Sequence, residues 1–360
     1  MSGGVDSSIA LVLLKKQGWE PIGISLKLPV WQSPKNLLRE NTCCNKESLK
    51  IAKKICQKLG VEYYIFDVRN DFKKEVIDYF ISELKSKRTP NPCIVCNRYL
   101  KFRKIFEFAK KLGASHIATG HYARVRKVKS QKSKVKSFEL LRGRDKDKDQ
   151  SYALCFLPQK WLSNIVFPLG GYTKTQAYQM AKDEGFDFLL KKPQSQDFCF
   201  VAGKSLPAFI KEKIGKKPGE IVDPKGKILG KHEGLYFYTI GQRKGINLSG
   251  GPWFVKEFNI PKNRLVVTKK VKDLFKKEVF LSPFHFINGK SPKKKVKVMA
   301  KIRYQQPLAK AILYPPKDGK LRLLFEKTQR AITPGQFAAF YLPAESAGEK
   351  EICLGGGRIV

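Results

Sequence analysis

The sequence contains few histidines and no long apolar segment. Only four of its 360 residues are histidines, which gives a zinc finger little support. No apolar run reaches the roughly 18 residues that suggest a membrane-spanning helix, and the start of the chain has no secretory signal pattern. These absences argue against a zinc finger, a membrane protein and an exported protein, and we expect a cytoplasmic location.

Acidic residues are also scarce. The chain has 31 Asp and Glu against 71 Lys and Arg, which gives a formal net charge of +40. Such an excess predicts a large polyanionic partner such as nucleic acid, because Lys and Arg displace counterions from phosphates. The alternative interpretation is a lysine-rich composition that only decorates solvated faces. Hydrophobic residues make up 42% of the chain, which suffices for packed cores in two or three domains.

The most informative stretch stands at the start of the chain, where Ser2, Gly3, Gly4, Val5, Asp6, Ser7 and Ser8 precede an apolar helical run at 9–15. Adjacent glycines let a backbone turn tightly and approach a ligand. The N–H groups at a helix start bind anions, and the serine hydroxyls add donors. We interpret residues 2–8 as a pyrophosphate clamp. It lacks the Gly-Lys-Ser/Thr ending of a Walker P-loop, and an ordinary turn that caps a core helix is the alternative.

Only Met1 precedes this clamp, although such a loop is expected to follow a buried parallel strand. We therefore expect that the first strand of the sheet is missing, and that about six to ten further apolar residues at the start, a typical strand length, would stabilise the protein.

The pattern of the next residues predicts an α/β fold. Strand-like segments at 21–28, 61–66 and 116–119 alternate with helical segments at 46–59, 72–87 and 100–112. This alternation indicates a Rossmann-like, doubly wound parallel sheet within a nucleotide-binding and catalytic domain at 1–203. Turn clusters and short strands predict a small β-rich domain at 204–275. Strand-like segments at 295–303, 310–314, 321–325 and 337–341 predict a C-terminal β-barrel at 276–360.

The eight cysteines do not form the disulfide framework of a secreted domain. Cys56, Cys155 and Cys353 stand in apolar surroundings and are expected in the core. Cys43 and Cys44 fit a structural pair better than a pair of persulfide acceptors. Cys93 and Cys96 lie in a proline-stiffened loop at 89–98, where Arg88 and Arg98 would make exposed thiols reactive. Cys199 lies in a second site flanked by polar residues.

These motifs carry a resemblance to known proteins. The clamp resembles the signature of the PP-loop ATP pyrophosphatases. PNPCIVCN at 90–97, KF at 101–102, TGHY at 119–122, KDQSY at 148–152, SQDFCF at 195–200, TIGQRKG at 239–245, KIRYQ at 301–305, TPGQ at 333–336 and CLGGG at 353–357 together resemble the tRNA-specific 2-thiouridylases over nearly the whole chain.

This resemblance implies an activity and a set of partners. The family uses ATP, with Mg²⁺, to adenylate the C2 oxygen of the wobble uridine in certain tRNAs, which we expect to be those for lysine, glutamate and glutamine. Sulfur then replaces that oxygen, delivered through a relay that begins at a cysteine desulfurase. Reaching C2 requires the base to swing out of the anticodon stack into a pocket.

The resemblance also assigns roles to individual residues. It implies Cys199 as the persulfide carrier and Cys96 as the second catalytic cysteine, which closes a disulfide with Cys199 as sulfur leaves. The remaining assignments are Ser2 to Ser8 with Leu26 and Gly120 for ATP, Asn91, Pro92 and Cys93 for the target base, and His121, Lys148, Asp149, Gln150, Arg303, Tyr304 and Gln336 for tRNA.

One position departs from the family pattern. Cys93 replaces an aspartate that is usual in the family, so Cys93, Cys96 and Cys199 are also candidates for three thiolate ligands of a [4Fe–4S] cluster that delivers sulfide. A metal-free persulfide route is the alternative. Three further interpretations remain: a PP-loop thiolase that acts on another tRNA base, an ATP-dependent ligase that needs no reactive cysteines, and an inactive RNA-binding protein.

Overall fold

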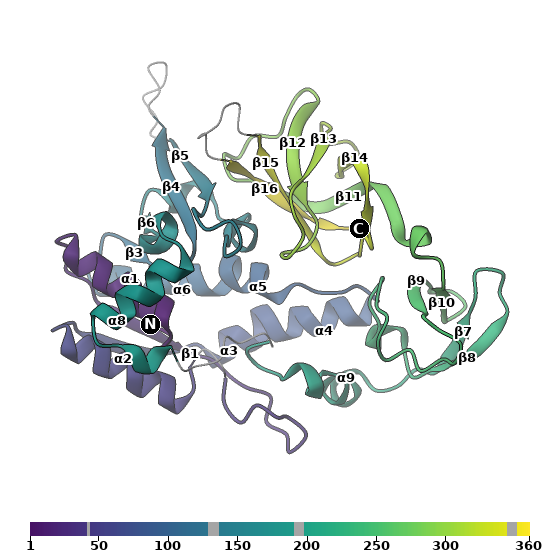
Figure 1. The fold of residues 1–360 in the computed structure, drawn as a ribbon, viewed down its shortest axis with the longest axis horizontal. Coiled ribbons are helices and arrows are strands. Elements are labelled where there is room, and N and C mark those ends of the chain that lie inside the picture. The colour runs from purple at the N-terminus through teal and green to yellow at the C-terminus, as the bar shows by residue number, and fades with distance from the viewer. Residues whose placement is uncertain (42–43, 129–136, 191–197, 344–350) are drawn as a thin grey trace.

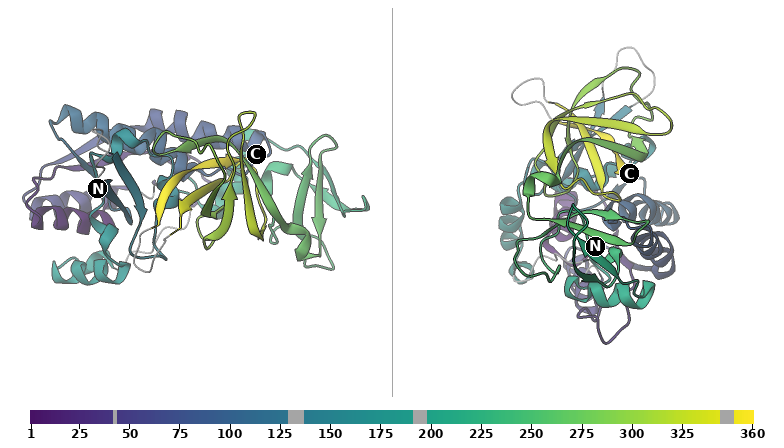
Figure 2. Two further views of the ribbon diagram at one scale, coloured as in Figure 1. Left: turned by 90° about the horizontal axis from the view of Figure 1, so that it is seen from above. Right: turned by 90° about the vertical axis from the view of Figure 1, so that its right-hand side faces the viewer.

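The computed structural model describes residues 1–41, 44–128, 137–190, 198–343 and 351–360 (Figure 1). Seen from above, the barrel (yellow) lies between the N-terminal region (purple to teal) and the central sheet (green) (Figure 2). None of the helices within the described ranges is long and apolar enough to cross a membrane.

Helices dominate the N-terminal region. Most residues of the first helix are buried, as the apolar run at 9–14 requires. The α-helices are α1 (Val5–Lys16), α2 (Lys46–Lys58), α3 (Arg69–Phe72), α4 (Asp78–Lys85), α5 (Pro92–Val95), α6 (Phe102–Lys111), α7 (Gln159–Leu162), α8 (Lys174–Asp183) and α9 (Leu206–Ile214). Two π-helical turns join α3 to α4 and α5 to α6; they are η1 (Lys73–Ile77) and η2 (Cys96–Lys101). The short 3₁₀ turns are η3 (Ser151–Leu154), η4 (Pro168–Gly171), η5 (Asp187–Leu189), η6 (Gly203–Ser205), η7 (Leu235–Phe237) and η8 (Val271–Leu274).

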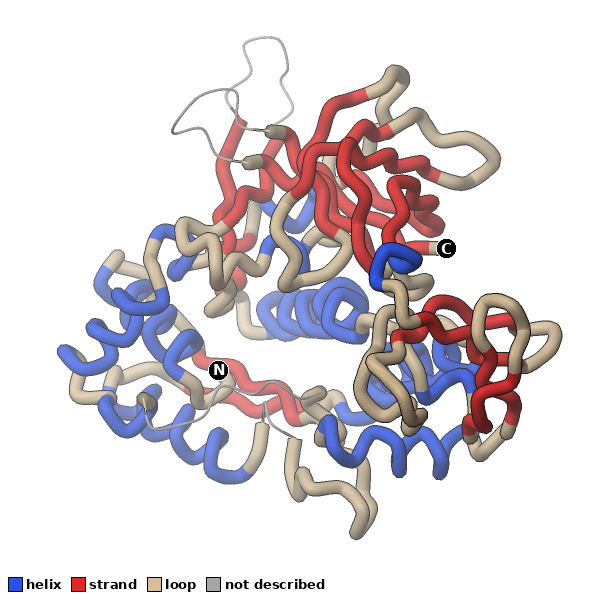
Figure 3. Tube along the Cα trace, turned by 45° about the vertical axis from the view of Figure 1, so that its right-hand side comes forward, coloured by secondary structure: helices blue, strands red, loops and turns tan. Residues whose placement is uncertain are grey.

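The parallel sheet is present as two separate pairs of strands. β1 (Gly23–Lys27) pairs in parallel with β2 (Tyr63–Asp67), and β3 (Ile117–Ala118) pairs in parallel with β6 (Ile165–Val166). Figure 3 shows β1 and β2 between helices, close to the N-terminus. A cavity of about 1100 Å³ lies between the two pairs. Its apolar lining comes from both pairs and from the faces of two helices, and includes Leu14 of α1, Ile24 of β1, Ala109 of α6 and Ile117 of β3.

The central region is a small four-stranded sheet that follows α9. Its strands are β7 (Gly219–Val222), β8 (Ile228–His232), β9 (Phe254–Asn259) and β10 (Arg264–Thr268), in the order β8-β7-β10-β9. Its core is built from buried aliphatic side chains, among them Ile221, Val255 and Leu265. The predicted β-rich character of this region is confirmed.

The C-terminal region is a closed antiparallel barrel. Its strands are β11 (Phe275–Phe286), β12 (Val296–Lys301), β13 (Ala309–Leu313), β14 (Leu321–Arg330), β15 (Phe337–Leu342) and β16 (Ile352–Ile359). They follow the order β11-β14-β13-β12-β15-β16, and a pairing of β11 with β16 closes the circle. Closure leaves the barrel without an edge strand.

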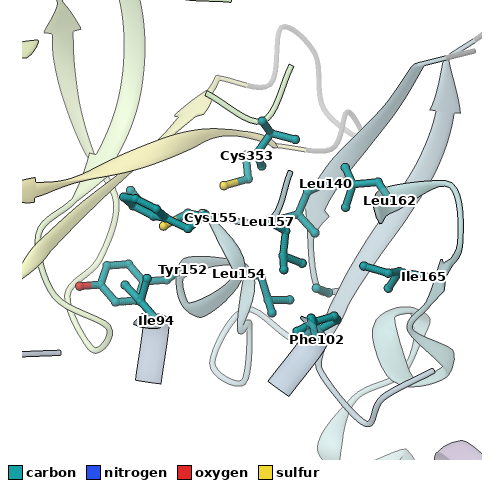
Figure 4. Close-up of a cluster of buried hydrophobic side chains, with 14 of the residues drawn as sticks. Ile94, Phe102, Leu140, Tyr152, Leu154, Cys155, Leu157, Leu162, Ile165 and Cys353 are labelled. Carbon is teal, nitrogen blue, oxygen red and sulfur yellow. The ribbon is translucent and has the colours of Figure 1, made fainter. Parts of the chain in front are cut away.

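A hairpin from the N-terminal region extends this barrel sheet. β5 (Ser137–Arg142) pairs with β4 (Ala123–Val128) on one side and with β16 on the other, where Cys353 faces Leu140. One hydrophobic core therefore spans both regions: Ile94 of α5, Cys155 and Cys353 are all buried in it (Figure 4). Burial raises the pKa of the Cys155 and Cys353 thiols, so both stay protonated, which fits their predicted place in the core.

The sequence prediction was wrong in two places. The segment with Cys93 and Cys96 was expected to be a loop, but α5 begins at Pro92 and continues through η2 into α6. The reason is that Asn91 and Pro92 form a helix start, with Asn91 as the N-cap and Pro92 at the first helical position. Strands β11 and β16 were also missed, because a proline and charged residues interrupt the alternation in β11 and three glycines do so in β16.

Candidate active site

The clamp folds as a tight turn into α1. Gly3 has φ of +65°, and a Cβ at this position would lie 2.2 Å from the carbonyl oxygen of Ser48, so only glycine fits. The Ser2 backbone N–H donates to Ser7 Oγ at 3.1 Å, and the Ser8 hydroxyl donates to the Gly4 carbonyl at 2.9 Å. Gly4 is the N-cap of α1 and has no side chain to occupy the N–H groups of the first turn. These groups remain available to an anion.

The large cavity brings eight of the predicted site residues together. It is lined by Ser2, Asp6 and Ser7 of the clamp, by Leu26 and Gly120 of the predicted nucleotide site, and by Cys96, His121 and Gln150. Gly120 allows this approach, because a Cβ there would lie 2.7 Å from the backbone carbon of Asp6. Val5 and Ser8 are buried on the α1 side of the clamp. The cavity thus joins the predicted ATP positions to Cys96, whereas Cys199 and the predicted target-base residues Asn91, Pro92 and Cys93 are not part of its lining.

Asp6 has two partners that the sequence did not reveal. Tyr122 donates its hydroxyl proton to Asp6 Oδ1 at 2.8 Å, and the ammonium of Lys174 lies 2.6 Å from the same oxygen. The capping-box pattern of Thr173 and Gln176 predicts a helix start beside Lys174. Nothing in the sequence indicates that this helix delivers a lysine to the clamp.

The two cysteines of the PNPCIVCN motif lie at the start of a helix. The Asn91 side chain accepts a hydrogen bond from the Ile94 N–H at 3.4 Å, which caps α5. Cys93 is exposed in the first turn, whereas Cys96 is half-buried and faces the cavity. The positive end of a helix dipole favours a thiolate over a thiol, as a sulfur nucleophile requires.

Cys199 is held by the aromatic residues on either side of it. Phe198 and Phe200 both pack edge-to-face against Phe80 of α4, with ring centroids 5.3 and 5.6 Å away. Cys96 and Cys199, which are far apart in the sequence, pack against the same hydrophobic cluster around Phe80. Phe198 and Phe200 thus anchor this segment to α4, and Cys199 lies half-buried between them.

The described residues do not gather a metal site. No group of three or more His, Cys, Asp or Glu side chains among them is close enough to hold a metal ion. Cys93, Cys96 and Cys199 are all described, so this conformation does not present them as three ligands of one cluster. Residues 194–197 of the second cysteine motif lie outside the described residues.

Comparison with known proteins covers the whole chain. The model for the tRNA methyl transferase HUP domain matches residues 1–203, the tRNA methyl transferase PRC-barrel domain matches 207–269, and the aminomethyltransferase beta-barrel domain matches 276–359. The tRNA-specific 2-thiouridylases MnmA of Clostridium perfringens and Halothermothrix orenii are both 40% identical to the chain, over 363 and 364 residues. The alignments cover all of this chain and 96% and 97% of those proteins. The chain belongs to the tRNA-specific 2-thiouridylase family.

A tRNA-specific 2-thiouridylase MnmA of Clostridium botulinum is 42% identical over 366 residues, and this alignment covers 100% of this chain and 96% of that protein. Among solved structures, the predicted subunit of tRNA methyltransferase from Methanocaldococcus jannaschii matches with a TM-score of 0.27 and 18% identity, over 50% of this chain and 72% of that one. The likeness to that structure is too low to add to the assignment.

Three of the predicted tRNA positions, Lys148, Asp149 and Gln150, lie in one loop and differ in how far they are exposed to solvent. Asp149 is buried and accepts hydrogen bonds from Arg142 at 2.8 Å and from the Gly143 and Ser151 N–H groups at 3.1 Å. Its side chain therefore shapes the loop that carries half-buried Lys148 and Gln150. Tyr122 and Gln150 exchange hydrogen bonds of 2.9 and 3.0 Å, which fixes Gln150 beside the cavity. tRNA contact by these residues stays a prediction.

His121 faces the cavity as a neutral side chain. Burial, together with the nearby charge of Lys101, lowers the pKa of His121 to about 3. Its Nδ1 lies 2.8 Å from the Thr119 hydroxyl, which orients the ring. Any contact that His121 makes with tRNA at neutral pH would therefore be a hydrogen bond or ring contact and not an ion pair.

The predicted tRNA positions in the barrel hold the regions of this protein together. Arg303 donates to the Ile240 carbonyl at 3.2 Å and to the Thr333 hydroxyl at 2.7 Å, which ties the barrel to the central region. Gln336 donates to the Thr89 and Pro90 carbonyls at 3.1 and 3.2 Å, directly before α5. Tyr304 remains 40% exposed. Burial of its hydroxyl and the nearby charges of Asp149, Asp145 and Cys93 raise its pKa to about 12, so it stays protonated.

The structure describes only part of two further predicted segments, the Cys43–Cys44 pair and the basic residues at 124–136. Cys44 is buried, and its Sγ lies 3.0 Å from the Leu28 N–H, which fits a structural role better than persulfide acceptance. Cys43 lies outside the described residues. The sequence RVRKVKSQKSKVK at 124–136 contains seven basic residues, which predicts contact with the nucleic-acid backbone. Its residues 124–128 belong to β4, and the rest lies outside the described residues.

A buried carboxylate fixes the segment that precedes the cysteine helix. Glu83 of α4, whose side chain is 4% exposed, contacts Arg88 and, from the barrel strand β16, Arg358, each at 2.7 Å. The Thr89 N–H donates to the Pro334 carbonyl at 2.8 Å beside this group. The position of α5 therefore depends on an ion-pair network between the N-terminal region and the barrel.

We expect Glu83→Gln to lower the free energy of unfolding by about 2 kcal/mol, because it removes the buried anion of two half-buried guanidinium groups, which water still partly solvates. Urea unfolding of this variant and of the control Glu257→Gln, which changes an exposed residue, measures the effect as a shift in midpoint at constant slope. A loss below 1 kcal/mol would contradict the role given to this network.

Proposed function

We propose that this chain is an ATP-dependent tRNA-uridine 2-sulfurtransferase that thiolates the wobble uridine. The observation that carries the proposal is the shared cavity. The phosphate clamp, Gly120 and Leu26 line the same space as Cys96, His121 and Gln150. Full-length similarity to proteins named tRNA-specific 2-thiouridylase supports the reaction. The net charge of +40 supports a tRNA partner.

The first step is activation of the uridine. The C2 oxygen attacks the α-phosphorus of ATP, a new oxygen–phosphorus bond forms, and pyrophosphate leaves with the electrons of the broken bond. The N–H groups at the start of α1 and the clamp hydroxyls hold the pyrophosphate. Adenylation makes the uridine C2 carbon a better electrophile, because its oxygen can then leave as part of AMP.

The second step is sulfur transfer. Cys199 carries a persulfide, and the Cys96 thiolate attacks the Cys199 sulfur that bears it. The terminal sulfur leaves as hydrosulfide, adds to C2 and expels AMP, while Cys96 and Cys199 form a disulfide. A thiol reductant returns both cysteines to the starting state with two electrons. A sulfur-relay protein fed by a cysteine desulfurase reloads Cys199, and the reaction takes place in the cytoplasm.

A [4Fe–4S] cluster on Cys93, Cys96 and Cys199 is the competing route. The three side chains are not gathered for metal binding in this conformation, so the steps above use the cysteines alone. Magnesium would accompany ATP as the usual partner of its phosphates.

The test is nucleoside analysis by mass spectrometry of unmodified tRNA incubated anaerobically with the protein, ATP, Mg²⁺ and a thiol reductant. A cysteine desulfurase with cysteine supplies persulfide sulfur in one set of reactions, and sulfide with or without reconstituted iron supplies sulfur in the other. We expect 2-thiouridine at the wobble position. The variant Asp6→Ala is the negative control, because it disrupts the clamp. A thiolated base at another position would favour a different PP-loop thiolase, and iron dependence would favour the cluster route. Absence of both thiolated nucleoside and AMP would contradict the proposal.

A further inference from the structure

Lys174 lies beside the clamp because of how α8 starts and packs. Thr173 caps the helix, and the Thr173 and Gln176 side chains bond each other's backbone in a capping box. Lys174 is the first residue of the helix. The buried Ala177 and Ala181 of α8 pack with residues of α1 in one hydrophobic cluster. The start of α8 is therefore held against the start of α1, where the clamp lies.

The Lys174 ammonium is already confined. It lies 2.6 Å from Asp6 Oδ1 and over the rings of Tyr178 and Tyr122, 4.8 and 5.9 Å from their centroids. The Lys174 side chain is 14% exposed and that of Asp6 is 39% exposed. Holding a lysine in one place costs side-chain entropy, and an ion pair whose carboxylate is partly exposed contributes only modestly to stability. The position of the Lys174 ammonium is better explained by a negatively charged ligand that binds at the clamp.

The backbone of Lys174 is linked to the predicted tRNA loop. Its N–H donates to Asp145 Oδ2 at 2.8 Å, and Asp145 Oδ1 accepts from the Asp147 and Lys148 N–H groups at 3.1 Å. The same carboxylate thus orders both the start of α8 and the turn that carries Lys148. This fixes the lysine relative to the cavity without occupying its ammonium.

We propose that Lys174 is a catalytic residue of the adenylation step, and that its ammonium binds the pyrophosphate portion of ATP and neutralises it as it leaves. This inference rests on the proposed function. Asp6 holds the ammonium in place before ATP binds. A polyphosphate at the clamp would bring several negative charges next to the Asp6 carboxylate, and the ammonium that now pairs with Asp6 supplies the compensating charge. Lys174 makes no covalent bond; the oxygen–phosphorus bond to pyrophosphate breaks with its electrons on the leaving group.

The test compares Lys174→Met and Lys174→Arg with Lys182→Met, a control at an exposed position of the same helix. In single turnovers with tRNA and ATP, we expect Lys174→Met to release pyrophosphate about 10²- to 10³-fold more slowly than the unmodified protein, the effect of losing one preorganised group at a developing charge. Lys174→Arg should release pyrophosphate at a rate between those of Lys174→Met and the unmodified protein. Lys182→Met should change that rate less than twofold.

A binding measurement without tRNA separates a phosphate contact from a structural role. We expect Lys174→Met to weaken binding of inorganic pyrophosphate about tenfold or more while AMP binds with unchanged affinity, because only pyrophosphate carries the charge that Lys174 meets. Equal weakening for both ligands, or pyrophosphate release within threefold of the unmodified rate, would overturn the proposal. If the unmodified protein binds pyrophosphate but never releases it from ATP with tRNA, the proposed function fails and with it the catalytic role of Lys174, whereas the pyrophosphate affinities of Lys174→Met and Lys182→Met still decide whether Lys174 contacts the phosphates.

Discussion

Replacing Cys199 with serine is expected to lower 2-thiouridine formation by a factor on the order of 10⁴ or more, the scale seen when a nucleophile is removed from an enzyme. A serine hydroxyl cannot carry a persulfide, so the sulfur loses its carrier. tRNA should bind within about twofold of its original affinity, because phosphate contacts dominate that affinity. The packing of Phe198 and Phe200 on Phe80 is untouched by this change, so the melting temperature should stay the same.

The measurement combines thiolation in single turnovers with tRNA binding and intact-protein mass spectrometry. After incubation with a desulfurase and cysteine, the unmodified protein should gain the mass of one sulfur atom, and Cys199→Ser should not. Thiolation at the original rate in Cys199→Ser would refute the role of Cys199. Cys93→Ser separates the two sulfur routes: exposed Cys93 is dispensable for the persulfide route, whereas the cluster route predicts a loss as large as that of Cys199→Ser.

An apolar strand joined to Met1 is expected to raise the melting temperature by about 5 °C or more, since each kcal/mol gained shifts it by roughly 2–4 °C in domains of 150–250 residues. Within the described residues β1 pairs only with β2 and β3 only with β6. A cavity of about 1100 Å³, whose lining includes Ile24 of β1 and Ile117 of β3, separates them. Met1 already lies alongside β1: its amino group donates to the Ile24 carbonyl, and its own carbonyl accepts the Ser25 hydroxyl at 2.6 Å. An extension from Met1 thus starts between the two pairs.

The experiment adds six residues rich in valine and isoleucine before Met1 and compares them with six glycine and serine residues. The apolar extension gains ladder hydrogen bonds on both sides and buries its side chains against α1 and α6. The polar extension controls for length alone. Equal melting temperatures for the two extensions would show that the cavity does not accept a strand.

The sequence predicted the parts of the fold that depend on local patterns. The clean 3.6-residue periodicity of 46–59 predicted α2 to within one residue. The paired glycines predicted the tight turn before α1, because Gly3 adopts a conformation that other residues rarely reach. The helix at Pro92 was missed because two prolines suggested a loop, although a proline at the first helical position favours a helix.

Contacts between distant segments were the least predictable part of the site. No local signal links Lys174 to Asp6, which is 168 positions away, or Glu83 to Arg358, which is 275 positions away. Both contacts exist only because helices and strands pack in three dimensions. The family resemblance supplied Arg303 and Gln336 as tRNA positions but gave no indication that their side chains join the barrel to the central region and to the segment before α5.

The pairing of β5 with β16 has a consequence for how the protein unfolds. Cys353 of the barrel and Leu140 of the N-terminal hairpin are buried in one core together with Ile94 of the cysteine helix. Cutting the chain before β11 would expose that core on both fragments, so neither fragment should be stable alone. We therefore expect the barrel and the N-terminal region to melt in a single cooperative transition, so that a change that unfolds the barrel also unfolds the segment that holds Cys93 and Cys96.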